Sequence, residues 1–388
     1  MKGMLFVPTD QKDAPGGRQF GFVPGDLHYE NGVITAVELL NEADLSAQEQ
    51  ETYILPGLVD IHLHGCMGVD FCDSVLQDDD TVLETMCAYE TSSGVTSICP
   101  TTMTYDEERL ASIMRKARDF TGSDHPLHDR VIGVHLEGPF ISLEKCGAQN
   151  PKYIQAPNLA MLNRLQEASG GLVRLVAIAP ETDGAIDCIR EGSSSFTFSI
   201  AHTTAGYEIA SEAIKAGAKH VTHMYNAMPA FLNRAPGVIG AACDDKDTYV
   251  ELIGDGIHVH PAVVRATFSM FGNSRIVLIS DSMEATGKPD GKYALGGQDV
   301  FKQGSKATLE DGTIAGSVTN LFACMKSVIS MGIPAEDAIR CATINPARSI
   351  GVDKTVGSLE KGKRADILIC DKDLTLKRVL ASGVECNG

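Results

Sequence analysis

The pentapeptide Asp60-Ile61-His62-Leu63-His64 follows an apolar run and predicts a β-strand that ends in two imidazole rings. Side chains at positions i and i+2 of a strand point to the same face, so both rings can reach one ion. Imidazole and carboxylate ligands suit zinc, and also iron, manganese or cobalt. A lone His-x-His can be fortuitous, so the prediction of a metal centre depends on the rest of the chain.

Short β-branched runs alternate with amphipathic stretches through the middle of the chain, which is typical of a parallel α/β fold. Helix-like segments separate the runs, and Gly94, Gly122, Gly217 and Gly272 close several of them. We therefore predict a (β/α)8 TIM-like barrel over residues 53–355. Its eight expected strands cover residues 53–64, 95–101, 131–137, 172–179, 195–202, 220–223, 249–257 and 275–281.

Both ends of the chain fall outside this alternation. Residues 1–52 contain turn-rich strand signals, including the hairpin sequence Glu30-Asn31-Gly32-Val33. Residues 356–388 show a similar pattern of turns and strands. We predict that these two segments join into one small β domain beside the barrel.

Composition excludes several classes of function. The 388 residues carry a net charge of −18 and no basic tract, which argues against nucleic-acid binding. No apolar run approaches the roughly 20 residues of a membrane span, and the N-terminus lacks a signal-peptide pattern. The eleven cysteines are scattered without a CxxC pair, so neither a disulfide framework nor a thiolate zinc site is expected. We expect a cytoplasmic protein that contacts neither nucleic acid nor membrane.

Metal-capable and acid–base side chains recur where the expected strands end. In a (β/α)8 barrel these ends meet at one face, so the residues can form a single His/Glu site. A terminal acid could take a proton from water and return one to a leaving amine. The residues concerned are His62, His64, His135, Glu137, His202, His223, Asp255, His258 and Asp281.

Each of these residues also has a structural interpretation. Glu137 could be an ion-paired rim residue, since an unpaired buried carboxylate is costly. His202 and His223 could be hydrogen-bonded core histidines, and Asp281 could cap a helix. His135 shares the strand parity of Glu137, and we interpret it as a core histidine. The recurrence at equivalent strand ends favours the metal site for the others.

Six segments of the chain carry a resemblance to known proteins. They are Pro56-Gly57-Leu58-Val59-Asp60-Ile61-His62-Leu63-His64-Gly65, Leu136-Glu137-Gly138-Pro139-Phe140, Gly147-Ala148-Gln149-Asn150-Pro151, Thr222-His223-Met224-Tyr225-Asn226-Ala227-Met228, Asp255-Gly256-Ile257-His258 and Ser280-Asp281-Ser282-Met283. Together these segments resemble the amidohydrolase superfamily and, more narrowly, the N-acetylglucosamine-6-phosphate deacetylase family. The first segment indicates only the superfamily, whereas the second and fourth are more specific to the deacetylase family. The resemblance covers nearly the whole chain, including the split β domain.

The resemblance implies a role for each matching residue. Glu137, His202 and His223 match the principal metal ligands, and His62 and His64 match ligands of a second metal that only some members keep. One or two divalent ions per subunit are therefore expected, with zinc first and iron, manganese or cobalt as alternatives. Asp281 matches the catalytic acid/base. Residues that match the substrate site are Ala148, Gln149, Asn226, Ala227, Arg234, Asp255, His258, Ile314, Ala315 and Gly316.

The implied activity is the deacetylation of N-acetylglucosamine 6-phosphate to glucosamine 6-phosphate and acetate. A homodimer is implied too, because Arg234 matches a cation that grips the sugar phosphate across a dimer interface; an unpartnered surface arginine is the alternative. Gln149 stands where some members carry a histidine beside the substrate, which leaves N-acetylgalactosamine 6-phosphate open as the substrate.

Two other functions are alternatives to this deacetylation. Cyclic-amide hydrolases of the same superfamily usually bridge two metals with a modified lysine at the end of strand four. Here that strand ends Ala177-Ile178-Ala179-Pro180-Glu181, without a lysine. A non-catalytic barrel would have lost ligands, yet every expected position is filled. Both alternatives are disfavoured.

Overall fold

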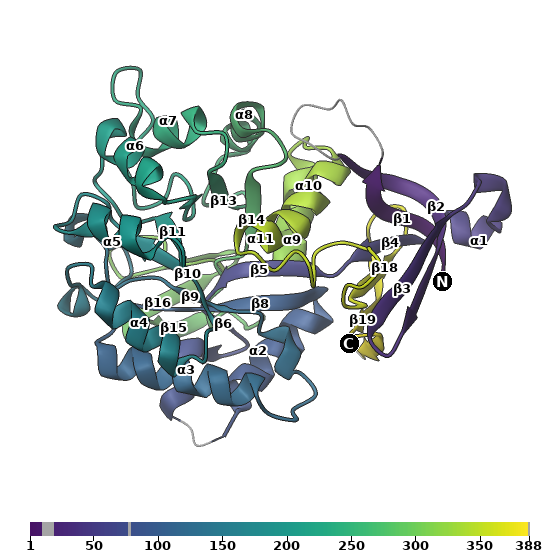
Figure 1. Cartoon of the computed structure of the whole chain (residues 1–388), viewed down its shortest axis with the longest axis horizontal. Helices are drawn as coiled ribbons and strands as arrows, with labels where there is room; N and C mark the ends of the chain where they lie inside the picture. Colours follow the sequence, from purple (N-terminus) through teal and green to yellow (C-terminus); the bar gives the residue numbers. More distant parts are fainter. Residues whose placement is uncertain (10–18, 77–78, 387–388) are drawn as a thin grey trace.

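The computed structural model describes residues 1–9, 19–76 and 79–386, and in it a barrel lies beside a smaller sheet (Figure 1). The barrel sheet is parallel and has the strand order β14-β13-β12-β11-β10-β9-β8-β5. Its edges meet where His64 N donates to Ser282 O (2.8 Å) and Asp281 N donates to His62 O (2.9 Å). The strands are β5 Leu58–Leu63, β8 Val95–Thr102, β9 Val134–Leu136, β10 Val173–Ile178, β11 Thr197–Ile200, β12 His220–Val221, β13 Tyr249–Ile253 and β14 Ile276–Ile279.

The predicted barrel is confirmed, and each expected strand range overlaps one barrel strand. The first expected strand, residues 53–64, is nevertheless two strands. Tyr53–Pro56 is β4, which belongs to the small sheet, and only β5 enters the barrel. Gly57 stands between the two strands, and a Cβ there would lie 2.0 Å from Thr96 Oγ1, so β8 leaves no room for a larger residue.

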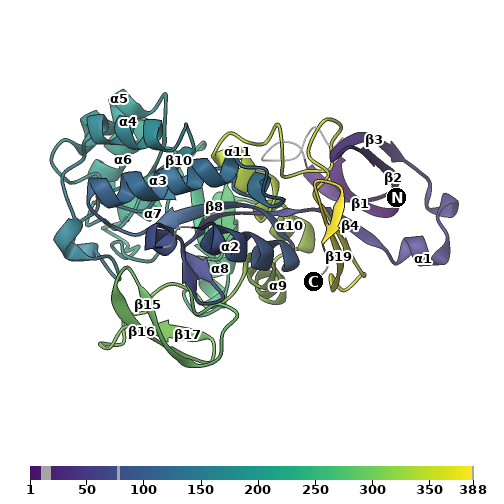
Figure 2. The same cartoon turned by 90° about the horizontal axis from the view of Figure 1, so that it is seen from below.

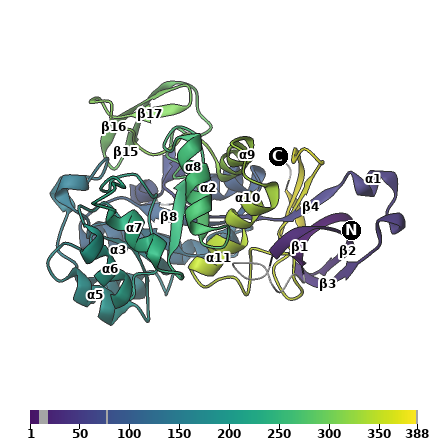
Figure 3. The same ribbon diagram turned by 90° about the horizontal axis from the view of Figure 1, so that it is seen from above.

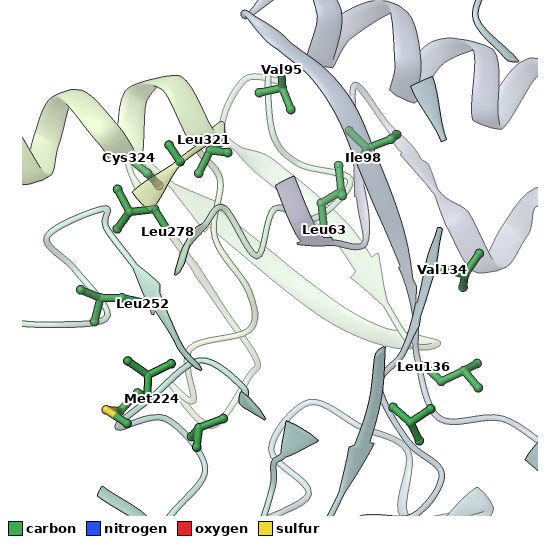
Figure 4. Close-up of a cluster of buried hydrophobic side chains, with 14 of the residues drawn as sticks. Leu63, Val95, Ile98, Val134, Leu136, Met224, Leu252, Leu278, Leu321 and Cys324 are labelled. Atoms are coloured by element: carbon green, nitrogen blue, oxygen red, sulfur yellow. The ribbon is translucent and has the colours of Figure 1, made fainter. Parts of the chain in front are cut away.

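Helices surround the barrel and cover the outward side chains of its strands. Figure 4 shows Leu278 of β14 beside Leu321 and Cys324 of α9, all fully buried. Residues beyond strand ends begin several helices with a polar cap; Asp106, for example, accepts from Arg109 N at 3.0 Å. The helices are α2 Thr81–Ser92, α3 Glu107–Thr121, α4 Leu159–Ala168, α5 Ala185–Gly192, α6 Tyr207–Ala216, α7 Gly237–Asp244, α8 Pro261–Phe271, α9 Leu321–Ser330, α10 Ala335–Cys341 and α11 Ile344–Ser349.

The small sheet takes strands from both chain ends, as the sequence predicts, and both termini lie on its side of the molecule (Figure 3). The expected hairpin is confirmed, with Asn31 and Gly32 at φ 48° and 77° between β2 and β3. The short helix α1, Ala47–Gln50, precedes β4. In sheet order the strands are β20 Val384–Cys386, β19 Leu376–Ala381, β18 Ile367–Cys370, β4, β1 Lys2–Thr9, β2 Gln19–Glu30 and β3 Val33–Leu39.

A three-stranded antiparallel sheet projects from the barrel (Figure 2), and the sequence analysis did not predict it. It consists of β15 Gly291–Leu295, β16 Gln298–Gln303 and β17 Lys306–Thr308. The Gly296-Gly297 turn between alternating apolar and polar residues is the hairpin signal that could have revealed it. A two-stranded ribbon, β6 Gly65–Cys66 and β7 Val69–Asp70, follows β5. In the described part of the chain, no helix has the length and apolarity needed to span a bilayer.

One buried acid, Glu90 of α2, lies outside the polar end of the barrel. It is 0% exposed, and among the described residues neither of its carboxylate oxygens has a hydrogen-bond partner. Burial, followed by the charge of Asp60, raises the pKa of Glu90 well above its usual value of 4.5. The folded chain therefore keeps Glu90 protonated to a higher pH than the unfolded chain does.

This difference predicts a pH-dependent effect of Glu90→Gln. The contribution of a neutral Glu90 to the stability is full below pH 4.5 and falls as the pH rises, because only the unfolded chain then releases the proton. We expect the variant to gain on the wild type by at most about 1.4 kcal/mol per pH unit above that value. Thermal unfolding of metal-stripped proteins from pH 4.5 to 8.5 measures the gain. Glu108→Gln, an exposed control, should show none; a constant difference for Glu90→Gln would contradict a neutral Glu90.

Candidate metal centre

The irregular end of β5 directs its two histidines into the barrel. Asp60 pairs with Ile98 of β8 and Leu63 pairs with Pro100, so β5 carries one more residue than β8 over this stretch. Such a bulge redirects side chains, and bulges are common next to active sites. The convergence of His62 and His64 therefore depends on the bulge as well as on the strand alternation that the sequence predicts.

Three other site residues begin loops with an unusual backbone. His202, His223 and Asp281 have φ values of 42°, 27° and 51°, in the left-handed region that residues other than glycine rarely adopt. Hydrogen bonds hold two of these positions: His223 N donates to Glu251 Oε2 (3.0 Å), and Asp281 N donates to His62 O (2.9 Å). Strained backbone of this kind concentrates at functional sites.

Glu137, His202 and His223 form the first ligand cluster. Glu137 Oε1 lies 3.0 Å from Nε2 of His202 and 3.0 Å from Nε2 of His223, and the two nitrogens are 3.1 Å apart. His202 Nδ1 donates to Lys145 O (2.8 Å), which leaves the Nε2 lone pair of His202 for a ligand. Two facing imidazole nitrogens and a carboxylate at these separations suit a shared cation.

His62, His64 and Glu137 form the second cluster, with Asp281 beside it. His64 Nε2 lies 3.2 Å from Glu137 Oε2, and His62 Nε2 lies 3.5 Å from Glu137 Oε1. Asp281 Oδ1 is 3.5 Å from His62 Nε2 and 3.4 Å from His64 Nε2. Within the described residues, His62 Nε2 is a buried nitrogen without a hydrogen-bond partner, so it is available to an ion.

The charges of the clustered histidines and carboxylates shift one another's pKa values. Burial alone would raise the pKa of Glu137, but His62, His202 and His223 hold it well below its usual range. Burial opposes a charge on His64, yet Asp281 and Glu137 raise the pKa of His64 to about 9. The pKa of Asp281 is lowered in turn, against its burial, by His62 and His64. A site with this much negative charge attracts a cation, either protons on the imidazoles or a divalent ion.

The donor set fits a divalent metal. Zinc binds imidazole and carboxylate atoms at about 2.0–2.1 Å, which requires donor atoms roughly 3–3.5 Å apart, as in both clusters. Glu137 belongs to both: its Oε1 lies near the rings of His62, His202 and His223, and its Oε2 lies near His64. A third group of His62, His135 and Glu251 also offers donors within 4.8 Å of one another, deeper in the barrel.

A cavity of about 430 Å³ opens above the two clusters, and most of the predicted substrate residues line it. Gln149 does so from a buried position, where its Nε2 donates to Glu137 Oε2 (2.8 Å) and its Oε1 accepts from Thr104 N (2.7 Å). Gln149 therefore orients the shared carboxylate. The predicted substrate residues that line the cavity are Ala148, Gln149, Asn226, Ala227, His258, Ile314 and Gly316.

Three predicted substrate residues do not line the cavity. Asp255 lies behind His258, whose Nδ1 donates to Asp255 Oδ2 at 2.7 Å. Burial opposes a charge on His258, but this carboxylate raises its pKa. Ala315 is only 1% exposed, between Ile314 and Gly316. Arg234 is exposed on the loop between β12 and α7, outside the cavity of its own chain.

The cavity also contains residues that the sequence analysis did not single out. Lys145 brings a cation into the wall, and Leu295 of β15 shows that the projecting sheet contributes to it. Lys145 precedes the quoted motif at Gly147, and Leu295 precedes the Gly-Gly turn, so both adjoin recognisable signals. The remaining lining residues are Met103, Glu144, Gly147 and Thr313.

A (β/α)8 barrel with a buried histidine–carboxylate centre and an acid in its cavity wall is the arrangement of a metal-dependent hydrolase. The model of the amidohydrolase family matches residues 53–386. The chain belongs to the amidohydrolase family, whose members hydrolyse with the help of bound metal.

Individual relatives are similar along most of their length. N-acetylglucosamine-6-phosphate deacetylase of Bacillus subtilis (strain 168) is 35% identical over 337 residues, which cover 86% of this chain and 84% of that protein. N-acetylgalactosamine-6-phosphate deacetylase of Escherichia coli O157:H7 is 34% identical over 360 residues, 92% of this chain and 93% of that protein. The similarity therefore includes enzymes for both sugar isomers.

Solved structures agree in fold. A mutant N-acetyl-D-glucosamine-6-phosphate deacetylase from Mycobacterium smegmatis, in complex with N-acetyl-D-glucosamine-6-phosphate, matches with a TM-score of 0.86 and 33% identity. The match covers 94% of this chain and 95% of that one. N-acetylglucosamine-6-phosphate deacetylase from Thermotoga maritima matches with a TM-score of 0.85 and 28% identity, over 100% of this chain and 99% of that one.

The shared position of Glu137 predicts how metal content responds to mutation. We expect Glu137→Gln to lose all tightly bound metal, because the carboxylate belongs to both clusters, whereas His64→Asn should lose only the ion of the second cluster. Elemental analysis after dialysis measures both. His28→Asn, a control in the small sheet whose side chain is 45% exposed, should keep the wild-type content. Full metal content in Glu137→Gln would show that the ions bind elsewhere.

Proposed function

We propose that this protein hydrolyses the acetamide group of N-acetylglucosamine 6-phosphate to give acetate and glucosamine 6-phosphate, a step of amino-sugar catabolism. The observation that carries the proposal is the single cavity in which Glu137, His202, His223 and Asp281 meet the predicted sugar-contacting loops. Deacetylases of phosphorylated amino sugars among the relatives support the same substrate class.

We propose one or two divalent ions per subunit, with zinc as the first candidate and iron, manganese or cobalt as alternatives. Glu137, His202 and His223 would hold one ion, and His62, His64 and Glu137 a second. When bound, a divalent metal activates water for attack and polarises the carbonyl group. Both tasks are needed for amide hydrolysis at neutral pH.

Asp281 is the proposed acid/base. Its carboxylate lines the cavity, is 7% exposed, and is kept ionised by the lowered pKa that His62 and His64 cause. An ionised acid in this position accepts the proton of the attacking water and then donates it to the amine nitrogen of the sugar as the C–N bond breaks. Its lowered pKa makes the second transfer favourable, since a weakly basic carboxylate releases the proton readily.

Residues of the cavity wall would hold the sugar. The bond between Nδ1 of His258 and Asp255 fixes the ring, and the Nε2 of a protonated His258 can donate to a substrate oxygen. Asn226 and Ala227 line the same cavity from the loop after β12. Together they would place the N-acetyl group against Glu137 and Asp281, which lowers the entropy cost of the reaction.

Arg234 would bind the sugar phosphate of a neighbouring subunit in a homodimer. The loop that carries it exposes Phe231 (51%) and Leu232 (57%), and large exposed apolar side chains next to an arginine are typical of interfaces. Because Arg234 does not reach the cavity of its own chain, a partner subunit would give it a function. Lys145 is the cation in the cavity of the same chain.

A cytoplasmic location is proposed on the basis of the thiols. All eleven cysteines are free, and the eight that are buried have a raised pKa mainly because of burial, including Cys66, Cys99 and Cys341. Free, protonated thiols are typical of proteins in a reducing compartment.

The cyclic-amide hydrolase alternative finds no support at the fourth strand. Beyond Ile178 the chain continues Ala179-Pro180-Glu181, and Glu181 binds Thr203 and Thr204 instead of entering the metal clusters. A non-catalytic barrel is equally disfavoured, because the described ligand positions all carry donor side chains.

An acetate-release assay tests the function directly. The enzyme, reconstituted with zinc or iron, would be given N-acetylglucosamine 6-phosphate, its galactosamine isomer and unphosphorylated N-acetylglucosamine. We expect the first sugar to be the preferred substrate. Preference for the galactosamine isomer would assign the other sugar, and no turnover of any of them would overturn the deacetylase assignment.

For Asp281→Asn we expect the fold and the metal content to persist while kcat falls by about 10²–10⁴-fold, since an amide cannot relay the proton. Single-turnover acetate release and elemental analysis on the same preparation measure both quantities. Ser282→Ala would be unsuitable as a control because Ser282 joins the barrel edges; Thr319→Ala, on the loop before α9, serves instead. Near-normal kcat in Asp281→Asn would remove Asp281 from this role.

For Arg234→Ala we expect a rise of about 10-fold or more in KM for the phosphorylated sugar, with little change for the unphosphorylated one, because a charge-assisted phosphate contact is lost. Arg115→Ala, an exposed arginine on α3, is the matched control. Equal effects on the two sugars would place the phosphate contact elsewhere, with Lys145 as the next residue to mutate.

A further inference from the structure

Glu251 of β13 lies beneath the two ligand clusters, and the mechanism above does not use it. It is 0% exposed in the middle of the apolar strand Tyr249–Ile253. Its ion pairs within the described part of the chain are with the rings of His62 and His220. A carboxylate in such surroundings is costly to bury, so its contacts need a reason.

One oxygen of Glu251 contacts both clusters. Glu251 Oε2 accepts from His62 Nδ1 at 2.9 Å and from His223 N at 3.0 Å. His62 belongs to the second cluster and His223 to the first. The same atom therefore touches a ligand of each proposed ion.

The bond to His62 decides which ring nitrogen carries the proton. A carboxylate oxygen only accepts, so Nδ1 of His62 is protonated and the lone pair of a neutral ring is on Nε2. That Nε2 faces Glu137 at 3.5 Å and Asp281 at 3.5 Å. Without an acceptor at Nδ1, the ring could rotate or adopt the other tautomer, which would present N–H to the ion.

The bond to His223 holds its backbone. His223 has φ 27°, a conformation that a histidine rarely adopts, and its N–H would otherwise be a buried donor without a partner. By accepting that N–H, Glu251 stabilises the turn that brings the His223 ring to within 3.0 Å of Glu137 Oε1.

We propose that Glu251 is a positioning residue that couples the two clusters, setting the tautomer of His62 and fixing the backbone of His223. The binding of the ion at His62 and His64 then depends most strongly on Glu251, because the contact to His62 orients a ligand ring directly. The inference rests on the proposed metal centre but not on the identity of the sugar.

The deeper group of His62, His135 and Glu251 offers a competing explanation, in which these residues bind an ion themselves. An ion there would use the His62 Nδ1 that now donates to Glu251. The ring of His135 packs edge-on against His62, with centroids 4.6 Å apart. Substitution of His135 therefore separates the two explanations.

The experiment measures cobalt binding to metal-stripped protein, by visible absorption and by competition with a chelator, so that its readout is independent of deacetylation. Glu251→Gln keeps both the length and an acceptor oxygen. Glu251→Asp keeps the charge but is one methylene shorter and loses contact with His62. Glu90→Gln is the matched control for replacing a buried acid, and circular dichroism verifies folding.

We expect Glu251→Asp to weaken the second ion about 10- to 100-fold, Glu251→Gln to stay within about threefold of the wild type, and Glu90→Gln to be unchanged. Equal loss in Glu251→Gln and Glu251→Asp would overturn the proposal, since charge and not the acceptor would then matter. Wild-type affinity in Glu251→Asp would overturn it as well. Loss of an ion in His135→Gln would favour the deeper site instead, whereas unchanged binding in that variant supports the proposal.

Discussion

Four imidazole rings converge on one buried carboxylate, that of Glu137, and the architecture of the site depends on this convergence. Its two oxygens lie 3.0–3.5 Å from the Nε2 atoms of His62, His64, His202 and His223. A carboxylate that is only 3% exposed persists only with such partners. The strands that carry the four rings, β5, β11 and β12, must therefore end at the same face of the barrel as β9. A closed parallel barrel places all its strand ends at one face.

Regular strands alone would not bring the rings together. The bulge in β5 directs His62 and His64 inward, and left-handed turns at His202 and His223 end two further strands abruptly. The barrel tolerates these irregularities because buried backbone N–H groups find acceptors: those of His64 and Asp281 donate to carbonyl groups between β5 and the chain after β14, and that of His223 donates to Glu251. The regular barrel strands and the strained turns at their ends thus act together to hold the site's side chains in fixed positions at the cavity.

The sequence predicted the strands well because apolar runs and their polar ends are local patterns. The same pattern predicts that Glu137, His202, His223 and Asp281 lie at one face of the barrel. The contact of Gln149 with Glu137 was not predictable in this way, because it joins a loop to a strand through side chains. Glu251 was a visible acid within an apolar strand, but its partner His62 is 189 positions away in the sequence.

The contacts of Gln149, a loop residue in the cavity wall, also bear on the choice of sugar isomer. Gln149 is engaged twice, with Glu137 and with Thr104 N, so it cannot turn towards a sugar hydroxyl without releasing the shared carboxylate. Gln149 therefore contacts a proposed metal ligand directly. We therefore propose that discrimination between the isomers depends on other parts of the cavity wall, such as Ile314 and the projecting sheet at Leu295. These segments lie outside the barrel strands, so they can vary while the arrangement around Glu137 stays fixed.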